Sequence, residues 1–478
     1  MNMRKRISAV ILACMMLVFA LYQGLQHTDR DVAMENNKGA GEKETLYFWY
    51  TDESLGDYLN SCALAFMEEH EDVRIVPTCV SAVEYLETIY DATMEGDVYP
   101  DLFVVTNDCL EKAYLSGIAT TIQDKAGLVT EENFPGTALS AVTCQDNLVA
   151  YPFYYETSLL LYNRTHLENM AQVRQEALLA QAEGEAAQAA ADALAAAGEE
   201  PDEAALAQAQ VQTEEQEEAQ RLSAGADALI PGTMDDILNL ADEYDAPEGV
   251  EAIMKWDVSD IFYNYFFAGN YIDVGGPDGD DDSVIDIYND NSVQCLNVYQ
   301  SLNQFFSIEA KETTYDSVLQ EFMEGKILFT VATTDAVAKL EQAKQEGQFS
   351  GEYAVTLLPD VSGQLRSRGL SVTNVIAVNG YGRHKKVANQ FAAFVAGQTD
   401  DALYQRCGKL SANLNVTHEN EMLDVAMEAY KKSAGLPKLI QASSFWVQLE
   451  VTLTGIWQGD DTAQALEKLQ QQIESQVK

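Results

Sequence analysis

The hydrophobic pattern of the chain changes period several times between residues 44 and 122. Short apolar runs of strand length alternate with longer segments whose apolar residues recur at helical spacing. The predicted strands are Thr45–Tyr50, Val73–Thr78 and Pro100–Thr106. The predicted helices are Ser54–His70, Ala82–Glu95 and Leu110–Ser116. Because strands that alternate with helices of about ten residues or more form βαβ units, this region is predicted to be an α/β domain with a parallel sheet.

Aromatic and polar residues gather where two of these strands end. Trp49 and Tyr50 close the first strand, and Asn107 and Asp108 follow the third. Ligands of open parallel sheets bind beyond the carboxyl ends of the strands. The sequence contains no nucleophile elbow, phosphate loop or paired-histidine motif beside these residues. The pattern therefore favours a binding protein, not an enzyme, and calls for no cofactor.

The same alternation of helices and strands continues in the second half of the chain. Helices are predicted over Thr233–Tyr244, Asp257–Phe267, Ser292–Phe306, Tyr315–Glu324 and Lys386–Ala396, and most residues after Asp401 are predicted to be helical. Strands are predicted over Ile327–Ala332, Ala354–Leu358 and Ser371–Val378. A chain of 478 residues has room for two or three such domains and a large core.

Several short motifs follow one another in a characteristic order. They are Thr45–Tyr50, Phe66–Ile75, Gly96–Val105, Leu148–Glu156, Leu161–Asn163, Phe322–Lys326 and Tyr353–Pro359. In this order they resemble the extracellular solute-binding proteins of ABC importers, in particular family 1, the sugar- and oligosaccharide-binding type that is similar to maltose-binding protein. Two positions depart from the family pattern: Glu71 replaces a usual proline, and Cys109 stands where many members have a large aromatic residue. The second departure leaves the ligand class open.

The resemblance implies a two-lobe, hinged, periplasmic-binding-protein-like fold of type II, which closes on a ligand between the lobes. The first lobe would comprise residues 44–150 and 356–397, and the second residues 151–355 and 398–478. The implied partners are a small solute, most simply a sugar, and the permease subunits of an ABC importer. The protein would act as a monomer.

The stretch from residue 171 to 225 differs from its surroundings. It is rich in Ala, Gln and Glu and contains no aromatic residue. These are strong helix formers, and Gly198 and Pro201 interrupt the run, so a helical hairpin inserted in the second lobe is predicted. It is expected to be either a passive solvated appendage or a docking arm for another protein.

The N-terminus has the pattern of an export segment. Arg4, Lys5 and Arg6 precede an apolar run, Ile7–Tyr22, and residues 23–43 form a polar stretch that fits a flexible tether. Residues 1–22 are therefore a signal or anchor segment. Three alternatives stay open: an uncleaved membrane anchor, ordinary cleavage, and lipoprotein processing at Cys14, which follows the lipobox-like Ile11-Leu12-Ala13. The expected location is the outer face of the cytoplasmic membrane, or the medium.

The net charge and the types of residue at the predicted site narrow the range of possible ligands. The formal net charge of −47 argues against nucleic acid as a partner, because phosphates would be repelled. Sugars stack their C–H faces on aromatic rings and need polar side chains for their hydroxyl groups. Residues of these kinds lie at strand ends, in loops or at the crossing between lobes. The candidate ligand-binding residues are Trp49, Tyr50, Asn107, Asp108, Tyr155, Glu156 and Trp446.

Metal binding and disulfide bonding receive little support from the sequence. No C-x-x-C pair occurs, and Cys62, Cys79 and Cys109 are expected to be buried free thiols, with a disulfide left open. Acidic residues from Asp278 to Asp282 resemble the start of a calcium loop, but Ser283 and Asn289 break that pattern. A solvated turn is expected there and no metal site.

One alternative keeps the fold but changes the role. A cell-surface sensor or protein-interaction module could use the same two lobes, with the inserted hairpin as its partner site. A gene neighbourhood with two permease genes would favour transport, and a neighbouring sensor kinase would favour the alternative.

Overall fold

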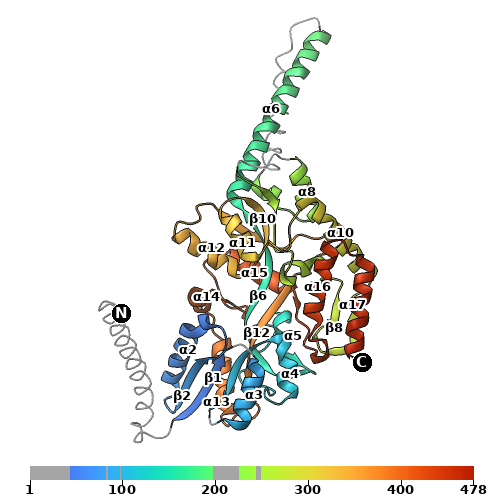
Figure 1. Cartoon of the computed structure of the whole chain (residues 1–478). Helices are drawn as coiled ribbons and strands as arrows, with labels where there is room; N and C mark the ends of the chain where they lie inside the picture. Colours follow the sequence, from blue (N-terminus) through green and yellow to red (C-terminus); the bar gives the residue numbers. More distant parts are fainter. Residues whose placement is uncertain (1–42, 82–83, 97, 198–224, 244–248, 478) are drawn as a thin grey trace, which may run out of the picture.

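The computed structural model describes residues 43–81, 84–96, 98–197, 225–243 and 249–477 (Figure 1). The predicted anchor Ile7–Tyr22, Cys14 and the tether lie outside the described residues. Within the described part, no helix is both long and apolar enough to cross a membrane.

The predicted βαβ region forms the first lobe. Its parallel strands are β1 (Glu44–Tyr50), β2 (Val73–Cys79) and β3 (Leu102–Thr106). The helices are α2 (Gly56–Glu69), α3 (Tyr85–Glu95), α4 (Leu110–Leu115) and α13 (Lys385–Ala396). In the parallel register Trp49 lies beside Thr78 on one side and Phe103 on the other. The strands and helices predicted for this region, and their order along the chain, are thus confirmed.

A single long strand, β6 (Ala150–Asn163), connects the two lobes. Its first half pairs with β12 (Leu370–Val378), and its second half pairs with β10 (Ile327–Thr333) and β11 (Tyr353–Thr356). The main sheet therefore runs continuously in the order β2-β1-β3-β12-β6-β10-β7, where β7 is Ala252–Met254. Every residue of β6 is buried except Glu156, so the connection between the lobes lies inside the protein.

The predicted lobe boundaries stay a prediction, although the packing refines them at two places. Strand β11 pairs with the second-lobe half of β6, although Thr356 was assigned to the first lobe. Helix α14 (Ala402–Cys407) packs against α2 of the first lobe, although residues after 397 were assigned to the second. Both differences arise because the chain crosses between the lobes more than once, and local hydrophobic patterns do not show which lobe a segment joins.

The second lobe is built on helices α8 (Met234–Glu243), α10 (Asp290–Phe306), α11 (Tyr315–Met323), α12 (Asp335–Gln345), α16 (Phe445–Trp457) and α17 (Thr462–Val477). Aromatic rings fill its centre: Trp256 contacts Trp457 at 5.5 Å between ring centroids, and Tyr299 contacts Trp457 at 5.0 Å. Such edge and tilted contacts are the arrangements that aromatic pairs prefer.

The helix predicted over Asp257–Phe267 is shorter than expected. Only α9 (Ile261–Asn264) and a 3-10 turn, η4 (Tyr265–Phe267), form there. Asp257 Oδ1 accepts hydrogen bonds from the backbone N and Oγ of Ser259, and Asp260 Oδ1 accepts one from Phe262 N. These side-chain turns compete with helix formation before residue 261, as short polar residues often do.

The described cysteines are all unpaired. Cys62 is buried, and Cys109 is half-buried, at an element end as predicted. Cys79, however, is exposed, because it is the last residue of β2, which lies at the edge of the sheet.

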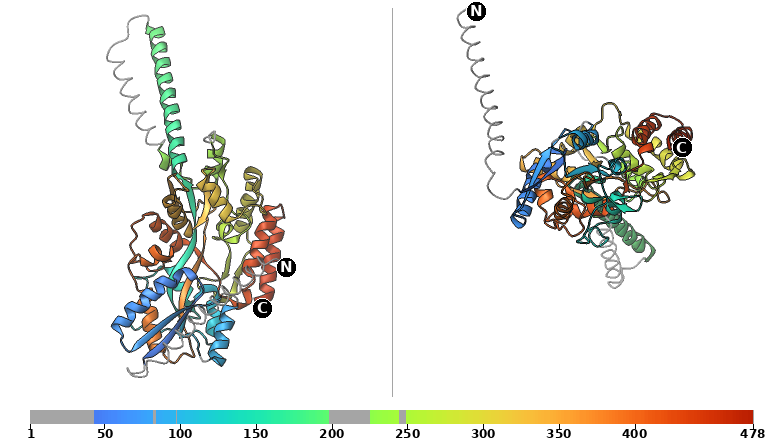
Figure 2. Two further views of the ribbon diagram at one scale, coloured as in Figure 1. Left: turned by 60° about the vertical axis from the view of Figure 1, so that its left-hand side comes forward. Right: turned by 90° about the horizontal axis from the view of Figure 1, so that it is seen from below.

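The insertion begins as one long helix, α6 (Arg164–Ala197), which projects from the second lobe (Figures 1 and 2). It starts before the predicted residue 171, because Asn163 Oδ1 accepts a hydrogen bond from His166 N at its first turn. Leu167, Met170 and Ala171 are buried in the second-lobe core, whereas most described positions beyond them are exposed. Residues 198–224 lie outside the described part, so the hairpin itself stays a prediction.

Removing the projecting part of the insertion should leave the lobes folded. Residues 175–222 contain no aromatic residue and no isoleucine, so their replacement by a short Gly-Ser linker is expected to change the free energy of unfolding by less than about 1 kcal/mol. Chemical denaturation measures this change. The control is Met170→Ala at the buried base of α6, which should cost about 2–5 kcal/mol. Loss of cooperative unfolding in the deletion variant would show that the arm belongs to the core.

Candidate functional site

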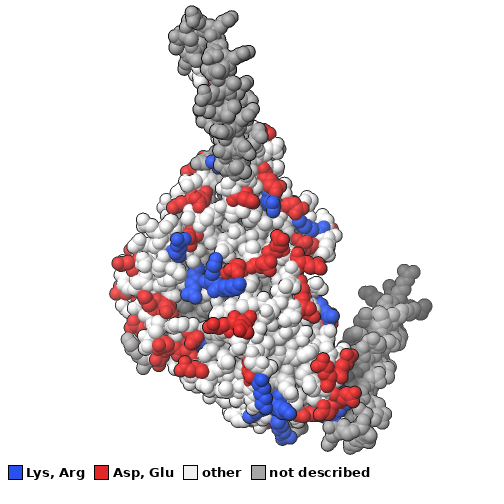
Figure 3. Space-filling view, turned by 180° about the vertical axis from the view of Figure 1, so that it is seen from behind, with Lys and Arg blue, Asp and Glu red and all other residues white. Residues whose placement is uncertain are grey.

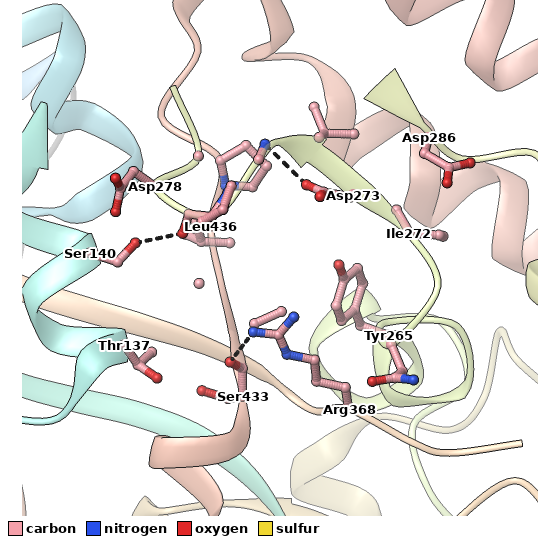
Figure 4. Close-up of a pocket in the computed structure, with 18 of the residues that line it drawn as sticks. Thr137, Ser140, Tyr265, Ile272, Asp273, Asp278, Asp286, Arg368, Ser433 and Leu436 are labelled. Carbon is pink, nitrogen blue, oxygen red and sulfur yellow. Dashed lines mark hydrogen bonds between the residues drawn. The ribbon is translucent and has the colours of Figure 1, made fainter. Parts of the chain in front are cut away.

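A cavity of about 930 Å³ lies between the two lobes (Figure 4). The first lobe contributes Asn107, after β3, and Thr137 and Ser140 of helix α5 (Gly136–Val142). The second lobe contributes residues of η4 and of the hairpin formed by β8 (Asp273–Gly275) and β9 (Asp281–Asp286). The cavity is also lined by Arg368, the segment 433–438, Lys431, Phe445 and residues 289–291 at the start of an α-helix. Cavities of this size hold small-molecule ligands.

The Asn107 side chain connects the end of β3 to β12 and to the segment 433–438 by hydrogen bonds. Its side chain is buried, with 1% exposed. Oδ1 accepts a hydrogen bond from Thr373 N of β12 at 3.1 Å, and Nδ2 donates one to Leu436 O at 3.0 Å. The carboxyl end of β3 is thereby fixed against β12 and against the segment 433–438. Both polar atoms of the amide are used, so Asn107 positions the lining.

The β8–β9 hairpin reaches from the second lobe to the first. Gly275, Gly276 and Gly279 have positive φ, and a Cβ at residue 275 would lie 2.5 Å from the backbone of Gly279, so this turn requires glycine. Ser140 Oγ donates to Pro277 O at 2.9 Å, and Gln145 N donates to Asp280 Oδ2 at 2.7 Å. The acidic stretch is thus a turn at the lobe interface, and the described residues hold no group of three ligands for a metal ion.

Lys438 is a buried residue that forms hydrogen bonds with both lobes at this interface. It is 1% exposed, its Nζ donates to Ser140 O at 2.6 Å and to Thr143 O, and its backbone N donates to Gly279 O at 2.7 Å. Burial lowers the pKa of this ammonium group, while nearby anions, among them Asp280, act in the opposite direction. The side chain of Lys438 therefore forms hydrogen bonds with the first lobe, and its backbone N–H forms one with the β8–β9 hairpin of the second lobe.

The rest of the lining combines aromatic rings, those of Tyr265, Tyr271 and Phe445, with groups that form hydrogen bonds. Figure 4 shows the hydroxyl of Tyr265 pointing into the space between Arg368 and Asp273. A tyrosine hydroxyl is protonated at neutral pH, and burial raises the pKa of Tyr265 further above its ordinary value. Asp278 and Asp286 add carboxylates, and Thr137 adds a hydroxyl group. This arrangement can bind a polar, hydroxyl-rich molecule, and nothing in it resembles a nucleophile next to a base.

The structure brings only part of the predicted site together. Of the seven candidates, Asn107 lines the cavity, and Trp446 packs against Tyr265 at 5.6 Å between ring centroids. Trp49 and Tyr50 are buried in the first-lobe core. Tyr155 is buried and stacks on Tyr430 at 4.0 Å, away from a free surface. Asp108 is half-buried and accepts a hydrogen bond from Thr106 Oγ1 at 2.5 Å. Their roles in binding stay predictions.

Glu156 belongs to a second polar cluster on the strand that joins the lobes. Lys409 Nζ lies 2.9 Å from Glu156 Oε1 and 3.0 Å from Asp52 Oδ2, and 5.5 Å from the centre of the Tyr154 ring. Burial alone would raise the pKa of Asp52, but hydrogen bonds from Ser54 and the charge of Lys409 lower it overall. The pKa of Lys409 is raised, since the two carboxylates outweigh its burial. The cluster links β6 to the residues that follow β1.

Several residues of the cavity lining, and Lys409 of the second polar cluster, are not indicated by the sequence. The run Gly275-Gly276-Pro277-Asp278-Gly279 signals a turn, but nothing local indicates that the turn touches α5. The segment 433–438 has no periodic pattern, and Lys409 is an isolated lysine before a two-residue strand, β13 (Leu410–Ser411). Only the pairing of distant segments reveals these residues.

Comparison with known proteins assigns this architecture to a class. The model of the bacterial extracellular solute-binding protein family matches residues 52–401, and the chain belongs to this family. Its members act outside the cytoplasmic membrane, as extracellular or periplasmic proteins. No curated protein matches the chain.

Solved structures with the same fold cover nearly the whole chain. An extracellular solute-binding protein from Staphylococcus aureus, in complex with maltose, has 17% identity and a TM-score of 0.65 over 91% of this chain and 98% of that one. The maltose-binding periplasmic protein MalE from Listeria monocytogenes, in complex with maltose, has 18% identity and a TM-score of 0.66 over 91% and 98%. MalX from Streptococcus pneumoniae, in complex with maltopentaose, has 17% identity and a TM-score of 0.62 over 90% and 99%. The predicted two-lobe fold is confirmed.

The ion cluster around Lys409 should make stability depend on pH. The pKa of Asp52 is depressed, so its contribution is present above the unfolded value of about 3.9 and is lost as pH falls through the folded value. The pKa of Lys409 is raised, so its contribution is present below about 10.4 and is lost as pH rises through the folded value.

Replacing Lys409 by Gln leaves two carboxylates facing each other and should destabilise the protein at neutral pH by about 1–3 kcal/mol. The difference from wild type should shrink at acidic pH, as the pH falls through the depressed folded pKa of Asp52 and removes one of the two negative charges. Urea denaturation at neutral and at acidic pH measures this. The control, Lys112→Gln, breaks an exposed pair with Glu87 and should cost less than about 1 kcal/mol. Equal effects of the two substitutions would contradict the assignment.

Proposed function

We propose that this protein captures a sugar or oligosaccharide in the interlobe cavity and delivers it to the permease subunits of an ABC importer. The observation that carries the proposal is that residues of both lobes line one cavity and that hydrogen bonds cross between the lobes at its rim. A ligand that contacts both lobes has more contacts in the closed form and therefore favours it. The permease then distinguishes the ligand-bound protein from the free protein by the relative position of the two lobes.

The chemistry of the lining supports a sugar. Aromatic side chains of Tyr265, Tyr271 and Phe445 line the cavity together with carboxylate, hydroxyl and guanidinium groups, the combination that the C–H groups and hydroxyl groups of a sugar require. The structures of similar fold from Staphylococcus aureus and Streptococcus pneumoniae hold maltose and maltopentaose respectively. The protein acts by binding alone, as a monomer, and needs no cofactor.

Two substitutions test the cavity without removing bulk from the core. Tyr265→Phe deletes one hydroxyl and Asp278→Asn one charge, and each should weaken binding of maltotriose or maltopentaose by about three- to thirtyfold, the value of a hydrogen bond to a sugar hydroxyl. Isothermal titration calorimetry on the purified full-length chain gives the dissociation constants. Saturating ligand should also raise the melting temperature, since it binds only the folded state.

The matched controls are Tyr288→Phe and Asp282→Asn, which make the same chemical changes at exposed positions outside the lining. They should bind like wild type. Binding that the cavity variants leave unchanged would place the sugar elsewhere. Failure of linear and cyclic maltodextrins, other oligosaccharides and monosaccharides to bind wild type would reject a sugar as ligand.

We propose further that the chain stays attached to the outer face of the membrane. Arg4, Lys5 and Arg6 would remain inside and hold Ile7–Tyr22 in the bilayer, while residues 23–43 let the lobes reach a permease. Acylation at Cys14 is the rival means of attachment. Membrane fractionation of Cys14→Ala separates the two routes: an uncleaved anchor stays in the membrane fraction, and a lipoprotein loses its acyl chains. Wild-type protein free in the medium and starting after Tyr22 would contradict both.

A further inference from the structure

A second cavity, of about 580 Å³, lies beside the first and is not part of the proposed sugar site. Its walls are Ser158 of β6, the loops 356–360 and 367–369, the C-terminal turn of helix α15 (Met422–Lys432) and the segment 227–232 that follows the insertion. Among the described residues, Arg368 alone lines both cavities. The volume falls in the range of small-molecule sites.

A buried polar atom of this cavity has no partner. Ser158 is 1% exposed, and its Oγ forms no hydrogen bond with any described residue. Buried hydroxyl groups are nearly always hydrogen-bonded, so an unpaired one in the wall of a cavity points to a bound group. Residue 369 is glycine, and a Cβ there would lie 3.0 Å from Ser158 Oγ. Glycine at this position leaves the space beside the hydroxyl free of a side chain.

The lining contains two basic side chains without a carboxylate partner among the described residues, which is unusual in so acidic a chain. Arg368 donates only to the backbone carbonyls of Lys432 and Ser433, and neither Arg368 nor Lys432 forms an ion pair with any described residue. The lining carboxylate of Asp360 is compensated, because it pairs with Arg366 and accepts a hydrogen bond from Ser367 N at 2.9 Å.

Asp227 is the other lining carboxylate. By formal charge the lining is neutral, with Arg368 and Lys432 against Asp227 and Asp360. Arg366 pairs with Asp360 from outside the lining and leaves one positive charge uncompensated, in a chain whose net charge is −47. Figure 3 shows how far acidic side chains predominate on one face of the molecule, with basic ones gathered in only a few places. The lining therefore favours a ligand with a negative charge.

From these observations we infer that the second cavity binds a small organic anion of sugar size. Its phosphate or carboxylate group is held by Arg368 and Lys432, with Ser158 Oγ donating a hydrogen bond. Ile230, Leu357 and Leu358 cover the uncharged part of the molecule. Arginine and lysine are the usual partners of such groups, and a hydrogen bond to an anion is stronger than a neutral one.

Two variants test the inference on the full-length chain. Lys432→Gln should weaken binding of glucose 6-phosphate or gluconate by about tenfold, and Ser158→Ala by about threefold or more. Lys432 is exposed, so its replacement should not disturb folding. Ser158→Ala removes an unpaired hydroxyl and should leave the melting temperature unchanged or raise it. Calorimetric titrations at constant ionic strength, with each anion as the probe, give the dissociation constants.

The matched control is Lys431→Gln. Lys431 is the adjacent residue and carries the same charge, but it lines only the first cavity and pairs with Glu428 at 2.6 Å. Anion binding that Lys432→Gln weakens and Lys431→Gln preserves supports the second site. Equal weakening by both variants would mean general attraction to a basic patch and would overturn the inference, as would the absence of saturable binding of either anion.

The two proposals fail in different ways. Anion binding that Tyr265→Phe weakens would place the anion in the interlobe cavity and reject the second site, while leaving the sugar proposal intact. Loss of maltodextrin binding in wild type would reject the sugar proposal alone, because neither Ser158 nor Lys432 lines the interlobe cavity.

Discussion

The pairing of β6 with partners in both lobes is the constraint on which the rest of the structure depends. One end of this strand is hydrogen-bonded to β12 and, through it, to β3; the other end is bonded to β10 and β11. Its backbone groups are satisfied along nearly its whole length, so the strand is costly to break and can only bend. The two lobes therefore share one continuous sheet through this strand.

The interlobe cavity follows from this arrangement. Because β3 ends beside the crossing, Asn107 reaches both β12 and the segment 433–438. Opposite it, the β8–β9 hairpin carries Asp273, Asp278 and Asp286 to the lining, and its turn meets α5 through Ser140. The hydrogen bonds at the rim are few, lie partly in solvent and join the lobes only at their edges. Such contacts can form and break with a ligand at modest cost in free energy.

Local patterns in the sequence predicted most helices and strands, whereas contacts between distant parts of the chain determine which residues line the cavity. The strands and helices of the first lobe, the buried strand β10 and the helix after Thr233 follow from periodicity and capping, which are properties of a few neighbouring residues. The aromatic residues Trp49 and Tyr155 looked like ligand contacts because they stand near strand ends. In the structure Tyr155 stacks on Tyr430 of α15, and both Trp49 and Tyr155 are buried. Lys409 and the segment 433–438 gain their positions from pairing over more than two hundred residues, which no local pattern encodes.

The most direct measurement of ligand capture between the lobes is hydrogen–deuterium exchange of the full-length chain with and without a saturating maltodextrin. A ligand held by both lobes should slow exchange together in α5, in the β8–β9 hairpin and in the segment 433–438, because each of these lines the cavity. Slower exchange confined to one lobe, or none at all, would contradict capture between them.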